Sequence, residues 1–375
     1  MYLFTNFSVY FALMKKGLFS ALILLVIFSC SPERKAQKNF RYGKYQNVIN
    51  YYQDVLSKKP SDGRANYFIA ESYRLSNRVK EAESYYAKAG GRGVDKDSVL
   101  LHYSQSLKAN GKYDLARKQI EELLANTSDE RMKDRASNEL NGLDKMEELA
   151  EKKSYYRVKN LELVNTPASE YSPAYLNSEL YFTSSRGSGK LYEATGTPFS
   201  DLYKAETNAA NVNISTLAPL PAIINAPNIN EGTITFSPDG KIMIFGKGNT
   251  GKRKGGNDVD LYLSRFRNGT WTEPALININ MPDGWESTPA FSQDGRTLYF
   301  SSNRKGGFGG LDIYSAQMDT RGRFGRVKNL GPEINTPGDE LFPYVSSSGK
   351  IYFSSDGHPG YGMLDIFVVN RLNGK

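Results

Sequence analysis

The chain has 375 residues, enough for more than one domain, and 39% of them are hydrophobic, so packed cores are expected. Its net charge of +8 is spread along the sequence without a long run of like charges, and we therefore expect no nucleic-acid partner. The single cysteine, Cys30, excludes an intrachain disulfide and a cysteine-based metal cluster within one chain.

Residues 1–29 have the pattern of a signal peptide. Lys15 and Lys16 precede thirteen uncharged residues, which are followed by Cys30, and this run is too short to span a bilayer comfortably. Met14 is a plausible true start. The sequence Ile27-Phe28-Ser29-Cys30 resembles the lipobox of bacterial lipoproteins, which implies cleavage before Cys30 and a diacylglycerol on its thiol. Two alternatives stay open: an uncleaved anchor helix and a simple secretory signal.

A period of 34 residues follows in residues 30–152. The triplets at 43–45, 77–79 and 111–113 are 34 residues apart, and small or apolar residues recur in the same phase at Val48, Ala82 and Ala116. This pattern resembles the tetratricopeptide repeat, and residues 129–152 resemble a closing helix that covers the last repeat. The resemblance implies a concave groove for a peptide or a partner helix. The alternative is a short structural arm.

From residue 153 to 375 short alternating apolar runs replace the helical period, which predicts strands. Four units align, each with an acid near its start, a central strand, and a third strand opening at Asp201, Asp260, Asp312 or Asp365. A unit of this length with about four strands is a propeller blade. The residues resemble the TolB-like, WD40-like propeller family. We therefore expect a multidomain α + β protein, an all-α solenoid followed by an all-β propeller of about four blades.

The two ends of the β-region have related sequences. Residues 157–164 resemble residues 326–333, which predicts an outer strand with no blade before it. Such a strand would complete the last blade and close the ring, which removes both sheet edges. Truncation of a longer propeller is the alternative.

No catalytic pattern is evident in the sequence. His102 falls in a repeat helix and is expected to pack, and His358 falls in a blade loop. Neither a G-x-S-x-G nor an H-E-x-x-H motif is present, and the glycine-rich stretch from Gly246 fails the phosphate-loop pattern. Four glutamates recur once per blade, which favours structural hydrogen bonding (Glu170, Glu231, Glu286 and Glu340). We expect no enzyme activity, no cofactor and no metal site.

Loop residues are the candidates for partner binding. Arginines and aromatic residues stand in or beside the glycine-rich loops of several units, where they could contact protein or glycan (Arg186, Arg304, Phe308, His358 and Tyr361). The order of lipobox, helical repeats and propeller resembles a family of outer-membrane lipoproteins, one branch of which belongs to type IX secretion and gliding.

That resemblance implies a lipid-anchored, periplasm-facing scaffold that binds other envelope proteins. The resemblance does not include the OmpA-like domain of the family, so it does not imply peptidoglycan binding. The alternative is a ligand-binding or glycan-binding propeller lipoprotein, with carbohydrate-active chemistry less favoured. It would need His358 and the blade acids to gather at the mouth of the channel.

Overall fold

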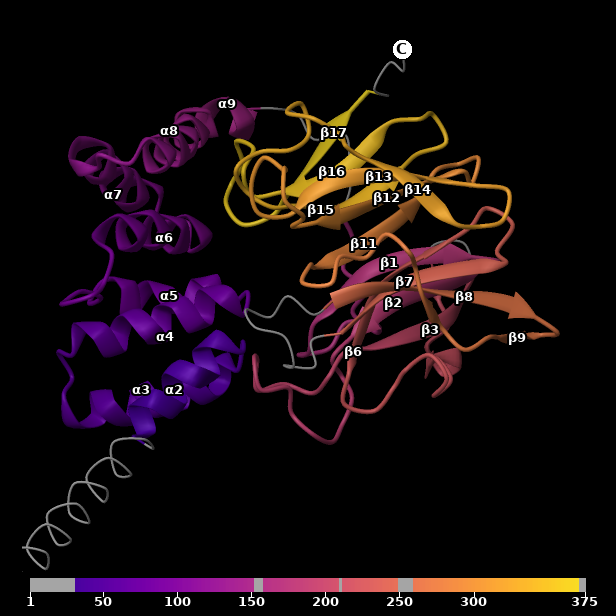
Figure 1. Ribbon diagram of the computed structural model, residues 1–375, viewed down its shortest axis with the longest axis horizontal. Coiled ribbons are helices and arrows are strands. Elements are labelled where there is room, and N and C mark those ends of the chain that lie inside the picture. Colours follow the sequence, from indigo (N-terminus) through magenta and orange to yellow (C-terminus); the bar gives the residue numbers. More distant parts are fainter. Residues whose placement is uncertain (1–30, 152–157, 209–210, 249–258, 371–375) are drawn as a thin grey trace, which may run out of the picture.

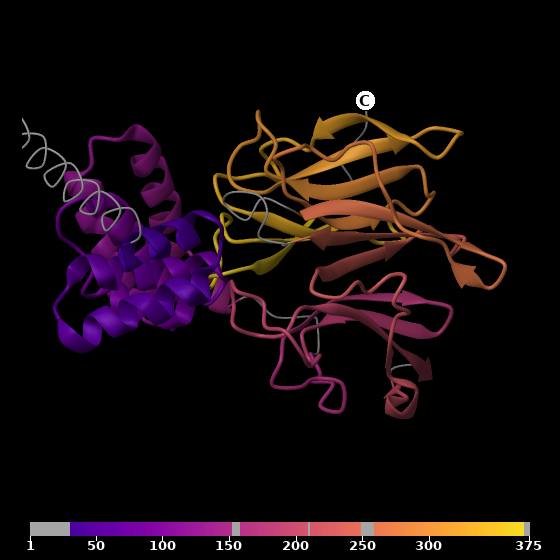
Figure 2. The same cartoon turned by 60° about the horizontal axis from the view of Figure 1, so that its bottom comes forward.

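The computed structural model describes residues 31–151, 158–208, 211–248 and 259–370. Cys30 and the predicted signal peptide lie outside these ranges. A helical domain and a β-domain lie side by side (Figures 1 and 2). The helices are α2 (Pro32–Arg41), α3 (Tyr45–Lys58), α4 (Gly63–Leu75), α5 (Val79–Tyr86), α6 (Lys96–Ala109), α7 (Tyr113–Asn126), α8 (Glu130–Asp144) and α9 (Met146–Glu151).

The helices repeat with the period that the sequence predicts. Helices α3, α5 and α7 begin 34 residues apart, at Tyr45, Val79 and Tyr113. On each of them the small or apolar side chain at the equivalent position is fully buried (Val48, Ala82 and Ala116). Larger side chains at these positions would keep the helices apart, so the period in the sequence is a packing requirement.

Two kinds of helix start alternate along the array. Helices α4, α6 and α8 begin after Asp62, Asp95 and Asp129, and each aspartate accepts a hydrogen bond from a first-turn backbone N–H. Helices α3, α5 and α7 begin after a lysine or arginine and have no side-chain cap. Their first N–H groups therefore need partners from elsewhere.

Four antiparallel sheets form the β-domain, one for each predicted unit. Blade one contains β1 (Glu170–Leu176), β2 (Glu179–Ser184), β3 (Asp201–Asn208), β4 (Asn211–Val212) and β5 (Ala218–Pro219). Blade two contains β6 (Asn230–Phe236), β7 (Ile242–Gly248), β8 (Val259–Arg267), β9 (Thr270–Trp271) and β10 (Ala275–Leu276). Blade three contains β11 (Glu286–Phe291), β12 (Thr297–Ser302), β13 (Asp312–Met318) and β14 (Phe324–Asn329). Blade four contains β15 (Glu340–Val345), β16 (Ile351–Ser355) and β17 (Asp365–Val369).

Consecutive blades pack through apolar clusters. One position of the third strand is fully buried in each of blades one to three (Leu202, Leu261 and Ile313). Leu202 and Leu261 each lie in a cluster that includes inner residues of the next blade. Ile313 packs with Ile334 and Phe353 in the same way. The corresponding residue of blade four, Ile366, is 79% exposed, so no described residue covers that face of the sheet.

The predicted strand at 157–164 is wrong for the residues that the structure describes. Residues 158–161 form no strand and 162–164 form a turn. Leu161 and Val164 instead pack on Leu180 and Phe182 of blade one. They occupy the place that Leu330 and Ile334 occupy between blades three and four. The covering residues of the two segments are thus equivalent, whereas residues 326–329 continue blade three as part of β14 and residues 158–160 form no strand.

Candidate functional site

A cluster of glutamate, serine and arginine recurs inside the blades. In blade one, Ser184 donates to Glu170 Oε1 (2.8 Å), and Arg186 donates to Ser184 Oγ (2.8 Å) and to Glu170 Oε1 (3.1 Å). A further Arg186 N–H donates to the carbonyl of Val164 (2.6 Å). The arginine thus joins the central strand, the first strand and the segment before the blade.

Blade three repeats the cluster with Ser302, Glu286 and Arg304. Ser302 donates to Glu286 (2.7 Å), and Arg304 donates to Ser302 (3.0 Å) and to Glu286 (3.3 Å). Arg304 also donates to the carbonyl of Ile279 (3.0 Å). The guanidinium lies 4.9 Å from the Phe300 ring centre. Glu286 is fully buried and the Arg304 side chain is 12% exposed, so this is a buried ion pair with an aromatic floor.

Blades two and four depart from this arrangement. In blade two Lys247 approaches Glu231 at 3.3 Å. In blade four Ser355 donates to Glu340 Oε1 (2.7 Å), but Gly357 stands where blade three has Arg304. Burial raises the pKa of Glu231 and of Glu340 to about 7, above the usual value for a glutamate.

His358 takes the arginine's place in blade four. Its Nε2 lies 2.8 Å from the carbonyl oxygen of Ile334, the counterpart of the Val164 and Ile279 carbonyls. Its ring contacts the rings of Phe353 and Phe367, with centres 5.6 Å and 5.0 Å away. Three of the predicted partner-binding residues, Arg186, Arg304 and His358, are therefore engaged within the blades.

Phe308 and Tyr361 have a different environment. They occupy equivalent positions in the loops at 303–311 and 356–364, and they are 48% and 43% exposed. Asp312 accepts hydrogen bonds from the backbone N–H of Phe308 (2.6 Å) and of Gly309 (3.2 Å), and Asp365 accepts one from Gly362 (3.2 Å). Both aromatic side chains are therefore displayed on fixed backbones at the surface.

The same loop side of the β-domain contacts the helices at two places. The first, which we call the blade-one contact, involves the insertion at 187–200. Glu193 pairs with Lys44 (2.6 Å), accepts from Asn47 (3.1 Å), and its carbonyl accepts from the backbone N–H of Gln46 (3.0 Å). Arg78 donates to the carbonyl of Ala194 (3.2 Å).

The blade-one contact supplies the missing cap of α3. A carboxylate at a helix N-terminus is favoured by the helix dipole, and Gln46 N is a first-turn donor without a partner inside the helix. The hydrogen bond from Lys44, together with the one from the Asn47 side chain, outweighs the effect of burial and holds the pKa of Glu193 below its usual value. The sequence showed this insertion as extra length and gave no signal for its partner.

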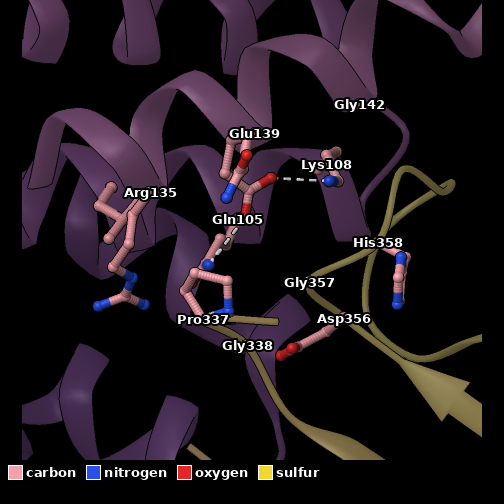
Figure 3. A pocket seen from close by; sticks show the side chains of 12 residues that line it. Gln105, Lys108, Arg135, Glu139, Gly142, Pro337, Gly338, Asp356, Gly357 and His358 are labelled. Carbon is pink, nitrogen blue, oxygen red and sulfur yellow. Dashed lines mark hydrogen bonds and ion pairs between the residues drawn. The ribbon is translucent and has the colours of Figure 1, made fainter. Parts of the chain in front are cut away.

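The second place, the blade-four contact, joins α6 and α8 to the loops at 336–339 and 356–362. A Cβ at Gly142 would lie 3.6 Å from Cα of Pro359, and one at Gly362 would lie 3.3 Å from Cε of Lys108. A small cavity of about 50 Å³ lies within it. Figure 3 shows Arg135, Glu139 and Lys108 on the helices and Asp356 and His358 on the opposite wall.

Charged groups dominate this cavity. Lys108 and Glu139 form a buried ion pair at 2.7 Å, and Gln105 also donates to Glu139 (2.9 Å). Asp339 and Asp356 are joined by a hydrogen bond from Asp339 N to Asp356 Oδ1 (2.7 Å). Burial and then the charge of Asp339 raise the pKa of Asp356 to about 6.

Other expected features have the following positions. His102 is 8% exposed and contacts Gln105 within the helical domain, where burial lowers the pKa of its ring to about 4. In the ranges that the structure describes, no group of three or more histidine, cysteine, aspartate or glutamate side chains is arranged to hold a metal ion. No helix in these ranges is long and apolar enough to cross a membrane.

No protein-family model matches the chain, and no curated protein matches it. The chain is similar to a solved structure assigned as TolB from Agrobacterium tumefaciens (16% identity, TM-score 0.31, 51% of this chain and 62% of that chain). It is also similar to a GH43 endo-arabinanase from Bacillus licheniformis (13%, 0.34, 53% and 72%) and an alpha-L-arabinofuranosidase from Lactobacillus brevis (10%, 0.36, 52% and 70%). The chain thus spans 62% of the TolB structure, and these low similarities assign it neither a family nor an activity.

Proposed function

We propose that the chain is a lipid-anchored scaffold that binds other envelope proteins at the periplasmic face of a bacterial outer membrane. The observation that carries the proposal is the loop side of blades three and four, where Phe308 and Tyr361 are half exposed on fixed backbones. Rigid aromatic side chains lose little conformational entropy on binding and are typical anchors of protein interfaces.

The neighbouring helical domain extends this surface. The blade-four contact places α6 and α8 beside the loop that carries Tyr361, so a partner bound there reaches both domains. The 34-residue period supports assignment of the helices as tetratricopeptide-type repeats, a class that commonly binds protein segments. By the family resemblance the setting is a type IX secretion or gliding complex.

The scaffold needs no catalytic step, and the proposal assigns none. A glycan-binding propeller, the alternative, would require free polar groups on the blades. His358 and the four recurrent glutamates are instead bonded within their own blades, for example Glu286 with Ser302 and Arg304, and this favours the scaffold.

The anchor is tested by Cys30→Ser. Without a thiol to acylate, this variant is expected to leave the membrane fraction, because stable anchoring requires several acyl chains. Sedimentation of membranes from the native host, followed by detection of the chain, gives the result. Retention of the variant with its signal segment intact contradicts the lipid anchor.

The binding surface is tested by Phe308→Ala and Tyr361→Ala. Each is expected to weaken recovery of an envelope partner that co-purifies with the unaltered chain by about tenfold or more, as for an interface anchor. Leu276→Ala is the control, since Leu276 is 59% exposed on the outer edge of blade two. Equal recovery with all three variants contradicts the assigned surface.

A further inference from the structure

The blade-four contact differs from the rest of the β-domain in its charge. Asp339, Glu340 and Asp356 are consecutive or hydrogen-bonded neighbours, and Asp312 of blade three also acts on Glu340 and Asp339. None of the first three forms an ion pair with a described lysine or arginine. In blade three the comparable glutamate, Glu286, forms an ion pair with Arg304.

Position 357 of blade four, which corresponds to Arg304 of blade three, has room only for glycine. A Cβ at Gly357 would collide with the side chain of Thr336, so the close approach of the loops at 336–339 and 355–358 excludes any side chain there. The chain instead places the imidazole of His358 on the Ile334 carbonyl. No described lysine or arginine of blade four therefore takes the place that Arg304 has beside Glu286 in blade three.

The helices supply the remaining charges around the acids. Arg74 of α4 and Arg135 of α8 act on Asp339, and Arg135 and Glu139 of α8 act on Asp356. Lys108 of α6 lines the same cavity but is already paired with Glu139. The helical domain thus covers Asp356, which lines the cavity, while it offers the two aspartates only distant positive charge.

We propose that the blade-four contact is proton-dependent: it closes when Asp339 and Asp356 share or bind protons and loosens when both are ionised. The blade-one contact holds the two domains together in both states, and the helical domain moves about it. Release of the blade-four contact would uncover the packed faces of α6, α8 and the loop at 356–362, beside the side chain of Tyr361 that is already exposed.

The direction of the effect follows from the pKa values. Burial raises the pKa of Asp356 to about 6, whereas a solvated aspartate titrates near about 4. Protonation of Asp356 therefore favours the closed contact fully below about pH 4, and this favourable contribution to closure is lost as the pH rises through about 6. Glu193 at the blade-one contact has a lowered pKa, so it stays ionised and paired over this range.

Hydrogen exchange of the full-length chain, purified from membranes, tests the proposal at about pH 5 and about pH 8. One group shifted from about 4 to about 6 changes the closure equilibrium by up to about 100-fold. After correction for the intrinsic pH dependence of exchange, we expect peptides covering 104–112, 135–145 and 356–364 to exchange at least about tenfold faster at the higher pH. Peptides covering 43–50 and 190–198 should not change.

Substitutions identify the groups responsible. Asp356→Asn keeps an oxygen that can accept from Asp339 N but cannot ionise, and it should abolish most of the pH effect. Asp339→Asn tests the second acid in the same way. Asp283→Asn, at an exposed position in the segment before blade three, should retain the full effect. Equal exchange at the two pH values in the unaltered chain, or an undiminished effect in both asparagine variants, overturns the proposal.

Discussion

At the scale of residues, the blades depend on a few buried charges that tie separate segments together. Arg304 joins β12, β11 and the segment before blade three through Ser302, Glu286 and the carbonyl of Ile279. Recurrence of the glutamates could be read from the sequence, and their structural role is confirmed by these bonds. Their arginine partners were expected on the surface, because an arginine beside a glycine-rich loop carries no sign of burial.

Loss of the blade-three arginine should destabilise the fold strongly. Arg304→Ala leaves the fully buried Glu286 without its cation, and breaking a buried pair in this way costs about 3–5 kcal/mol. Arg323→Ala is the matched control, because its pair with Asp319 is exposed and such pairs contribute about 1 kcal/mol or less. Urea unfolding measures both, and similar losses for the two variants would contradict the assigned role.

Two glutamates should make stability depend on pH. Burial raises the pKa of Glu231 and of Glu340 to about 7, whereas an unfolded glutamate titrates near about 4.3. Their contribution to the free energy of unfolding is full below about pH 4.3 and is lost as the pH rises through about 7.

We therefore expect the urea midpoint to fall between about pH 5 and about pH 8, with a slope of up to about 1.4 kcal/mol per pH unit for each group. Glu340→Gln should reduce this slope, because glutamine does not titrate. An unchanged slope in this variant, measured beside the parent chain, would show that other groups are responsible.

At the scale of elements, the periods in the sequence predicted the helical repeats and the four sheets, because local packing sets both periods. The 34-residue spacing appears in the starts of α3, α5 and α7, and the strand pattern gives four sheets. The segment at 158–164 was misread because its apolar residues cover blade one in the way that residues 330–334 cover blade four. A short sequence does not distinguish a covering segment from an edge strand, since both need apolar residues at close spacing.

The insertion in blade one should act as the cap of α3. Glu193→Ala removes the pair with Lys44 and the bond from Asn47, at a cost of about 1 kcal/mol. Amide exchange in the first turn of α3 is expected to rise in this variant. Glu333→Ala, at an exposed position with no part in the contact, should leave that exchange unchanged. Unaltered protection in Glu193→Ala would show that the backbone bond to Gln46 suffices.

At the scale of the whole molecule, the two domains form a continuous surface through contacts that sequence patterns do not encode. Glu193 and Lys44 are far apart in the chain, and each is an ordinary charged residue until the fold brings them together. Phe308 and Tyr361 could be singled out from the sequence because an aromatic residue in a glycine-rich loop is seldom needed for packing. The place of the Tyr361 loop beside α6 and α8 required the structure.

The central claim is that this loop side binds another envelope protein. Photo-crosslinking in native membranes, with a photoreactive phenylalanine analogue at position 308, tests it most directly. The account predicts a discrete adduct of higher mass at position 308 and none when the analogue replaces the more exposed Leu276. Absence of an adduct at 308, or equal adducts at both positions, would contradict the assignment of this surface.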